Sequence, residues 1–212
     1  MKVGWGVLLT TGQAASELGM AITTFRRLTR ANLIPGTTSR GVRVVVPLEA
    51  VQALAARSHA PLHHLAAREI AVLRVEPAKL PDSQQAPDDG PGSGFSADLD
   101  ERAVLDRLTG WWRCDAPSIA AGRVLPVTVA GYVVAVLTGL QRWESNGRGR
   151  HRFPGMQLAG YVTDLVSPRI HITATTDEDR AAAELLLAAR LPSESGGPIA
   201  YVSTHHPDPE GP

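Results

Sequence analysis

The chain has 212 residues, of which 43% are hydrophobic and 20% charged, and its formal net charge at pH 7 is zero. This length allows one large domain or two small ones, and the composition is that of a folded globular protein. Every apolar run is shorter than the roughly 20 residues of a transmembrane helix, and the single cysteine, Cys114, excludes an internal disulfide framework. We therefore expect a cytoplasmic protein without membrane association.

The zero net charge hides an asymmetry between the two parts of the chain. Residues 1–79 carry ten Lys or Arg against four Asp or Glu, and residues 80–212 carry eleven against seventeen, which gives +6 and −6. A basic first part followed by an acidic remainder favours a polyanion as partner of the first part, although scatter in surface charge is the alternative. Nineteen of the 21 basic residues are Arg, which is typical of a GC-rich bacterial genome.

Two short helices are predicted near the start, after an apolar run interpreted as a strand or helix approach. Thr11 is the expected cap of a first helix over residues 12–18, and Gly19 ends it because glycine turns left-handed at little cost. A second helix is predicted over residues 22–31, followed by a stop at Pro35 and Gly36. Its apolar stripe consists of Ile22, Phe25 and Leu28.

A hairpin and two further helices complete the first predicted domain, residues 1–75. The stretch TTSRGVRVVVP places β-branched residues on both sides of a Ser-Arg-Gly turn and predicts a hairpin over residues 37–47. Helical spacing returns over residues 48–57. The stretch LHHLAAREIAVLRV predicts an amphipathic helix over residues 62–75, which is too short for a sturdy dimerising coiled coil.

Two helices joined by a Gly turn, the second with arginines off its apolar stripe, form a helix-turn-helix pattern. A helix fits the major groove of B-DNA, where Arg donates two hydrogen bonds to guanine and Thr meets a methyl group or an acceptor. The predicted recognition residues are therefore Thr23, Thr24, Arg26, Arg27 and Arg30. Arg40 and Arg43 on the hairpin are expected to contact phosphates or the minor groove. The alternatives are a helix-turn-helix that contacts protein, or arginines that merely solvate a surface.

The stretch LTTGQAASELGMAITTFRRLTRANLIPG, with RGVRVVVPLEAVQALAAR after it, resembles the winged helix-turn-helix of the MerR-like and excisionase families. The resemblance covers residues 9–57 and implies a DNA-binding recognition helix followed by a basic wing. Ala21 departs from the family pattern because a Ser or Asn usually caps the second helix. Residues 44–47 replace an Arg-rich aromatic wing strand, which predicts a weaker grip on phosphates. The absence of a long coiled-coil helix favours the excisionase side of the resemblance.

Residues 76–97 are rich in Pro, Gly, Ser and Asp and are predicted to be a flexible linker. Residues 98–203 are predicted to form a small α+β domain, and residues 204–212 a disordered tail. In that domain a helix over residues 98–110 precedes four β-branched runs, a helix over residues 177–191 and a last strand. Thr175 and Glu178 have the spacing of a capping box. This order predicts a curled sheet or a small barrel.

The pattern of these β-branched runs resembles the PUA-like barrels, a superfamily that includes domains binding RNA or holding a flipped modified base. The resemblance implies Trp111, Trp112 and Trp143 as candidates for stacking a base. Core positions are nevertheless favoured for Trp112 and Trp143, because the chain has few aromatic residues. The basic loop at residues 148–152 is interpreted as a phosphate contact or as a solvated hairpin tip.

Catalytic motifs do not occur in the sequence: it contains no Gly-rich phosphate loop, no His-Glu-x-x-His and no Cys-x-x-Cys. His63 and His64 are adjacent and would point to different faces of the predicted helix, and residues 205–206 are histidines of the tail. The carboxylates at residues 177–179 are explained by the dipole at a helix start. We therefore expect no enzyme activity, no catalytic residue, no metal and no cofactor.

The sequence thus predicts a sequence-specific double-stranded DNA-binding protein, either a transcription regulator or an excisionase-like factor of a mobile element. The second domain would provide a homo-oligomer contact, a protein-partner surface or a ligand pocket. One alternative is a reader of a modified or flipped base through that domain. The other is a protein-interaction adaptor with no role in nucleic-acid binding.

Overall fold

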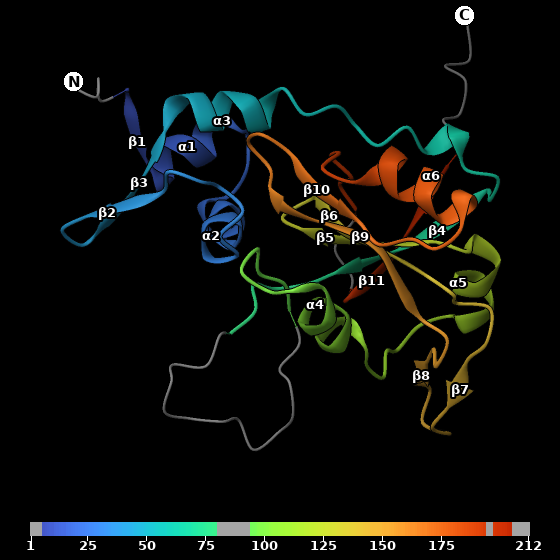
Figure 1. Cartoon of the computed structure of the whole chain (residues 1–212). Coiled ribbons are helices and arrows are strands. Elements are labelled where there is room, and N and C mark those ends of the chain that lie inside the picture. Colours follow the sequence, from blue (N-terminus) through green and yellow to red (C-terminus); the bar gives the residue numbers. More distant parts are fainter. Residues whose placement is uncertain (1–5, 80–93, 194–196, 205–212) are drawn as a thin grey trace, which may run out of the picture.

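The computed structural model describes residues 6–79, 94–193 and 197–204, and these form a mixed fold of helices and strands (Figure 1). The helices are α1 (Thr11–Glu17), α2 (Ile22–Arg30), α3 (Leu48–Ala55), the 3-10 helix η1 (Leu62–His64), α4 (Glu101–Leu108), α5 (Ala116–Gly122) and α6 (Asp177–Leu186). The strands are β1 (Leu8–Thr10), β2 (Thr38–Arg40), β3 (Arg43–Pro47), β4 (Glu69–Arg74), β5 (Leu125–Val129), β6 (Tyr132–Thr138), β7 (Glu144–Ser145), β8 (His151–Arg152), β9 (Gln157–Asp164), β10 (Arg169–Ile172) and β11 (Ile199–Ser203). The predicted α+β class is confirmed.

The helix α1 begins one residue before the predicted start, because Thr10 rather than Thr11 is its cap. The Thr10 hydroxyl accepts a hydrogen bond from the Gln13 N–H at 3.3 Å, and the Gln13 side chain accepts one from the Thr10 N–H at 3.0 Å. These two reciprocal hydrogen bonds form a capping box, in which the cap is the residue three positions before Gln13. Gly19 follows the helix with a φ of 62°, so the predicted left-handed stop is confirmed.

The helix α2 ends earlier than Pro35 and Gly36, where the sequence placed its stop. Its cap is Ala31, and Asn32 adopts a left-handed conformation with a φ of 53°. Asparagine tolerates this conformation better than most residues with a side chain, so it can end a helix as glycine does. At the other end, Ala21 makes no side-chain capping hydrogen bond, as its departure from the family pattern predicts.

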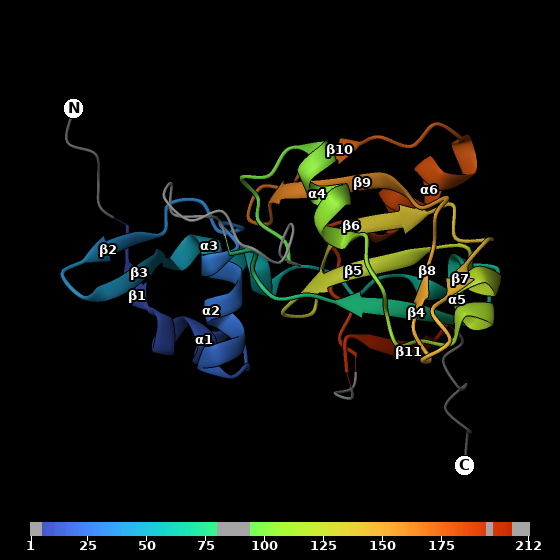
Figure 2. The same cartoon turned by 90° about the horizontal axis from the view of Figure 1, so that it is seen from below.

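The largest sheet has six strands in the order β10-β9-β6-β5-β4-β11 (Figure 2). The pair β4–β5 is parallel and the other neighbouring pairs are antiparallel. The edge strands β10 and β11 are not paired with each other in the described part of the chain, so this is an open sheet and not the closed barrel given as one expectation. Helices α6 and α4 lie on opposite faces of it (Figures 1 and 2).

The prediction of an amphipathic helix over residues 62–75 is wrong. The structure has the short 3-10 helix η1 there, followed by the strand β4, whose residues 70–73 are all buried. A strand in the middle of a sheet shows a continuous apolar run, and periodicity cannot distinguish such a run from a buried helix. Because β4 pairs with β5 and β11, residues 69–74 belong to the sheet of the second half. The division of the chain into domains stays a prediction.

Two further differences concern helices of the second half. The helix α5 was missed, because PSIAAG is short and lies within a stretch that has no apolar period. The helix α6 begins at Asp177 as predicted, but its cap is Thr176, whose hydroxyl accepts from the Asp179 N–H at 3.1 Å. The cap is therefore one residue later than predicted, and only the hydroxyl half of the predicted capping box is present.

The ends of the predicted linker are paired with each other. The Ala78 N–H donates to the Phe95 carbonyl at 2.8 Å, and the Phe95 N–H donates to the Glu76 carbonyl at 3.0 Å. Phe95 itself is fully buried. Backbone hydrogen bonds thus join the two ends of the predicted linker, while its residues 80–93 lie outside the described residues. The predicted tail is also outside them from residue 205 onward.

The N-terminal elements are docked on the second half through one continuous cluster of buried residues. Backbone carbonyls of α3, the cap of α2 and the segment after α2 accept hydrogen bonds from later parts of the chain: that of Ala31 from the Ala97 N–H at 2.8 Å, that of Leu33 from the Leu165 N–H at 3.0 Å, and that of Leu54 from the Tyr132 hydroxyl at 3.2 Å. These contacts fix the orientation of α2 and α3 relative to the six-stranded sheet. In the described ranges, no helix is both long enough and apolar enough to cross a membrane.

The Tyr132 hydroxyl provides a test of this docking. Tyr132 is 2% exposed, and loss of a buried hydrogen bond costs about 1 kcal/mol. We expect Tyr132→Phe to lower the free energy of unfolding by that amount in urea titrations. Tyr201→Phe is the matched control because Tyr201 is 39% exposed and water can replace its hydroxyl as acceptor of the Asp115 N–H. Equal losses in both variants would contradict the role given to Tyr132.

Candidate nucleic-acid interface

The helix α2 packs with one face and exposes its arginines on the other. Phe25 and Leu28 are fully buried, whereas Thr23, Arg26, Arg27 and Arg30 are exposed and Thr24 is half-buried. Residues three and four apart share a helix face, so the side chains at positions 23, 26, 27 and 30 form one polar surface. The apolar stripe predicted from the sequence is confirmed at Phe25 and Leu28, while Ile22 is 38% exposed at the start of the helix.

The hairpin β2–β3 presents two more arginines. Arg40 and Arg43 are directly opposite each other across the turn, and both are exposed. Gly41 has a φ of 59°, and Val42 at the tip of the turn is fully exposed. Exposure of Val42 is consistent with a turn that has no packing role in the chain itself. The predicted hairpin is therefore confirmed, with both arginines on its surface.

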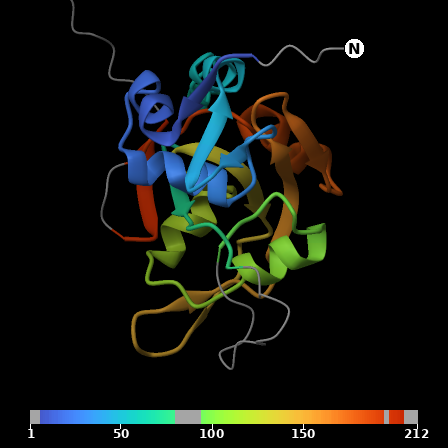
Figure 3. The ribbon, with the colours of Figure 1, turned by 90° about the vertical axis from the view of Figure 1, so that its left-hand side faces the viewer.

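A groove of about 570 Å³ lies between α2 and this hairpin. We call it the basic groove, and its lining consists of Thr10, Thr11, Arg26, Thr29, Arg30, Val42, Arg43 and Val44. None of these residues is acidic, and in the described part of the chain none of the three arginines makes an ion pair. Figure 3 views the molecule from this end, with the blue N-terminal elements in front of the sheet. The groove therefore combines three guanidinium groups with threonine hydroxyls.

Arg27 and Thr24 are separated from the basic groove. The Arg27 guanidinium forms an ion pair with the Glu76 carboxylate at 2.8 Å, and both residues line a different hollow, together with Thr24, next to the end of β4. The side chains of Arg27 and Glu76 are 44% and 65% exposed, so the ion pair is accessible to water. The structure thus brings Arg26, Arg30 and Arg43 together and directs Arg27 toward the second half. No local signal in the sequence identifies Glu76 as its partner.

The tryptophans of the second half do not form one pocket. Trp111 and Trp112 line a hollow near β4, and Trp143 is not part of it. Trp112 is partly buried against the core and lies 5.9 Å from the Phe153 ring, measured between ring centroids. Trp143 is 41% exposed, so the core position favoured for it is wrong. Trp111 is 37% exposed, with the Arg152 guanidinium 5.0 Å from the centre of its ring.

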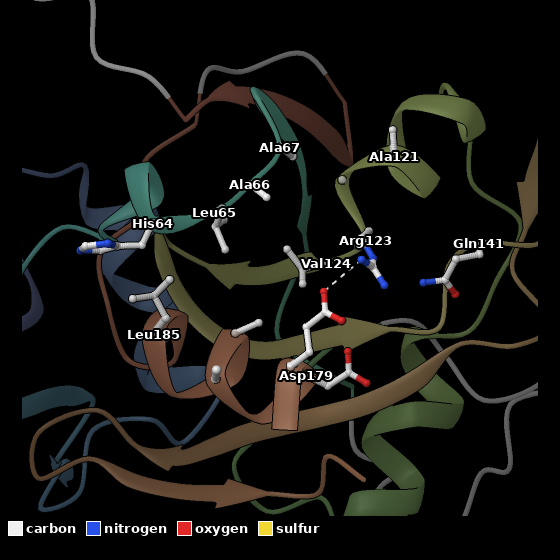
Figure 4. Close-up of a pocket in the computed structure, with 14 residues that line it drawn as sticks. His64, Leu65, Ala66, Ala67, Ala121, Arg123, Val124, Gln141, Asp179 and Leu185 are labelled. Atoms are coloured by element: carbon white, nitrogen blue, oxygen red, sulfur yellow. Dashed lines mark ion pairs between the residues drawn. The ribbon is translucent and has the colours of Figure 1, made fainter. Parts of the chain in front are cut away.

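Another hollow, of about 520 Å³, lies between η1, α5 and α6 (Figure 4). Leu65, Val124 and Leu185 line its apolar part, and Arg123 pairs with Glu178 at 3.1 Å on its polar side. Figure 4 shows Asp179 and Gln141 on that same side. Two carboxylates repel phosphate groups, so this hollow is not counted in the nucleic-acid interface.

The histidine and cysteine candidates do not assemble a site. His63 and His64 lie in η1 with ring centroids 4.1 Å apart, so the expectation that they point to different faces is wrong. Among the described residues, no group of three or more His, Cys, Asp or Glu side chains is placed to hold a metal ion. Burial, together with the charge of Asp115, raises the pKa of the Cys114 thiol to about 11. The Nδ1 atom of His151 lies 3.2 Å from the Cys114 carbonyl oxygen.

Comparison of the chain with protein-family models, curated proteins and solved structures gave no match. The resemblances to winged helix-turn-helix domains and to PUA-like barrels therefore stay predictions.

The raised pKa of Cys114 has a measurable consequence. Thiol reagents attack the thiolate, and a pKa of about 11 instead of 9.0 lowers the thiolate fraction at pH 8 about a hundredfold. We expect iodoacetamide at pH 8 to modify the native chain at least tenfold more slowly than the chain unfolded in urea, where the same cysteine is the internal control. The native rate should rise with pH up to about 11. Equal native and unfolded rates would contradict the burial of the thiol.

Proposed function

We propose that the chain binds double-stranded DNA, with α2 in the major groove and the β2–β3 hairpin against the phosphate backbone. The observation that carries this proposal is the basic groove, which Arg26, Arg30 and Arg43 line together and whose lining contains no acidic residue. Arginine donates bidentate hydrogen bonds to guanine and to phosphate, and each good base contact gives about 1–3 kcal/mol of discrimination. The hydroxyl groups of the threonines, which have shorter side chains, form further hydrogen bonds to bases or phosphates.

In this proposal the helix α2 and the hairpin β2–β3 make different kinds of contact with DNA. Arg26 and Arg30 are one turn apart on the exposed face of α2, where a helix inserted into a groove would contact base edges. Arg43 and its opposite neighbour Arg40 are on the hairpin, in the place of a wing. The start of α2 lacks a side-chain cap at Ala21, so its first N–H groups are available to a backbone phosphate. We propose that these groups contact one duplex together.

In this proposal the DNA-binding unit is a winged helix-turn-helix of the MerR-like or excisionase type. Its role would be transcription regulation or excision of a mobile element in a bacterial cytoplasm. Arg27 then does not have the role of a recognition residue that the sequence predicts for it, because its ion pair with Glu76 neutralises its charge next to the second half. An adaptor without nucleic-acid contacts remains the competing function, and it predicts no binding to duplex DNA even at low salt.

The first test is selection of bound sequences from a pool of random duplexes, followed by affinity measurements on arginine variants. We expect Arg26→Ala and Arg30→Ala each to weaken binding to the selected site by at least tenfold, and binding to random duplex by much less. Arg43→Ala is expected to weaken both about equally and to reduce the salt dependence by about one counterion. Arg180→Ala, an exposed arginine on α6, is the control with the same change of charge. Equal losses for Arg26→Ala on both duplexes would contradict base contacts by α2.

The second test concerns the ion pair between Arg27 and Glu76. Glu76→Gln removes the carboxylate and leaves a side chain of similar size, so the Arg27 charge becomes available to a phosphate. We expect duplex affinity at 50–100 mM salt, on the order of the ionic strength where such contacts dominate, to increase about threefold to tenfold. Arg27→Ala should then abolish the effect of Glu76→Gln, as a double-mutant cycle measures. An unchanged affinity of Glu76→Gln would show that Arg27 does not reach the DNA.

A further inference from the structure

The region around the hairpin β7–β8 is a second basic surface, separate from the basic groove. Residues 141–150 are all exposed, and residues 141–152 carry Arg142, Arg148, Arg150 and Arg152 against Glu144. The second part of the chain has a net charge of −6, yet this stretch has a net charge of +3. Arg152 pairs with Glu144 at 2.6 Å. The other three arginines make no ion pair within the described residues.

The tip of this hairpin holds its arginines in a defined turn. The Asn146 side-chain oxygen accepts hydrogen bonds from the N–H groups of Arg148 at 2.8 Å and Arg150 at 3.2 Å. The Asn146 N–H donates to the Arg150 carbonyl at 3.1 Å. Gly147 and Gly149, both with a φ of 71°, supply the left-handed positions that such a tight turn needs. The turn therefore presents two guanidinium groups from a fixed backbone.

The base of the hairpin is anchored to the body of the protein. His151 and Trp112 exchange two backbone hydrogen bonds of 2.8 Å, so β8 has a neighbour on the side away from β7. The Arg152 guanidinium lies over the Trp111 ring. Trp143, which is 41% exposed, directly precedes β7. Two exposed tryptophans thus lie at the base of a hairpin whose tip is cationic.

We propose that this surface binds single-stranded nucleic acid, with Arg148 and Arg150 on phosphates and Trp143 stacked on a base. Exposed tryptophan faces stack on unpaired bases, which a duplex keeps stacked on each other. Arginines beside them neutralise the backbone. Because Trp111 and Trp143 do not share a pocket, the contact is a surface contact and not a pocket for a flipped base. DNA and RNA strands offer the same chemistry, and the experiment separates them.

This surface and the basic groove lie at opposite ends of the molecule, as Figures 1 and 2 agree in showing for β7–β8 and β2–β3. One chain could therefore hold a duplex at one end and a single strand at the other. The inference does not rest on the proposed duplex binding, because none of its residues belongs to α2 or to the hairpin β2–β3.

The test uses the full chain with labelled single-stranded oligothymidylate and oligouridylate of about 12 nucleotides, within the site sizes of other single-strand binders. We expect Arg148→Ala/Arg150→Ala to weaken binding at least tenfold and to lower the salt slope by about 1.4, from two phosphates at about 0.7 each. Trp143→Ala is expected to weaken binding at least fivefold and to remove most of the tryptophan quenching by the oligonucleotide. A preference for one oligonucleotide identifies the natural strand. Circular dichroism checks that these exposed substitutions leave the fold intact.

Three controls make the proposal refutable. Arg169→Ala/Arg180→Ala removes two exposed charges elsewhere, and an equal loss of binding would show that only net charge matters. Arg26→Ala/Arg30→Ala should leave single-strand binding unchanged, and a loss there would assign the strand to the basic groove instead. Vesicles with anionic lipid test binding to a membrane surface, the other partner to which exposed Arg and Trp side chains bind. Binding to vesicles without binding to either oligonucleotide would overturn the proposal, as would no binding to the oligonucleotides at all.

Discussion

The end of α2 and the segment after it are hydrogen-bonded to the second half of the chain, and this contact fixes the orientation of the arginines of α2. The carbonyls of Ala31 and Leu33 accept from backbone N–H groups of residues 97 and 165, so two segments that are distant in sequence hold the same short segment. Phe25 and Leu28 are buried in the same continuous core. With α2 held on its apolar side, Arg26 and Arg30 face outward, whereas Arg27 is close enough to Glu76 for an ion pair.

The distribution of charge is therefore more local than the division into a basic and an acidic half indicates. The carboxylate that neutralises Arg27 belongs to Glu76, within the basic part of the chain, and the acidic part contains the basic hairpin β7–β8. A surface pair such as that of Arg27 and Glu76 is worth little in stability, typically below about 1 kcal/mol. Its effect is to select which guanidinium groups remain available to a polyanion. Surface charge in this protein is thus organised by neighbours in space and not by position along the chain.

Features that depend on neighbours in sequence could be predicted, and features that depend on distant neighbours could not. The left-handed turn at Gly19, the buried stripe of Phe25 and Leu28 and the hairpin with Arg40 and Arg43 all follow from local patterns, and the structure has them. The strand β4 looked helical because its apolar run is set by strands far away in the sequence. The same reason explains why Glu76 was missed as a partner and why Trp143 was expected in the core. The arginines of the candidate groove were all named from sequence, but their grouping into a groove and a separate ion pair was not.

The place of β4 in the sheet has a consequence for how the chain folds during synthesis. Its two neighbours are β5, residues 125–129, and β11, residues 199–203, so β4 leaves the ribosome well before either partner exists. A hydrophobic strand with open edges can pair with other chains, and pairings between distant segments form slowly. The four buried residues Ile70, Ala71, Val72 and Leu73 thus stay without their complete sheet until β11 has been made, about 130 residues later along the chain. Chaperone dependence and the yield of folded protein should accordingly depend on how soon β11 reaches its place beside β4.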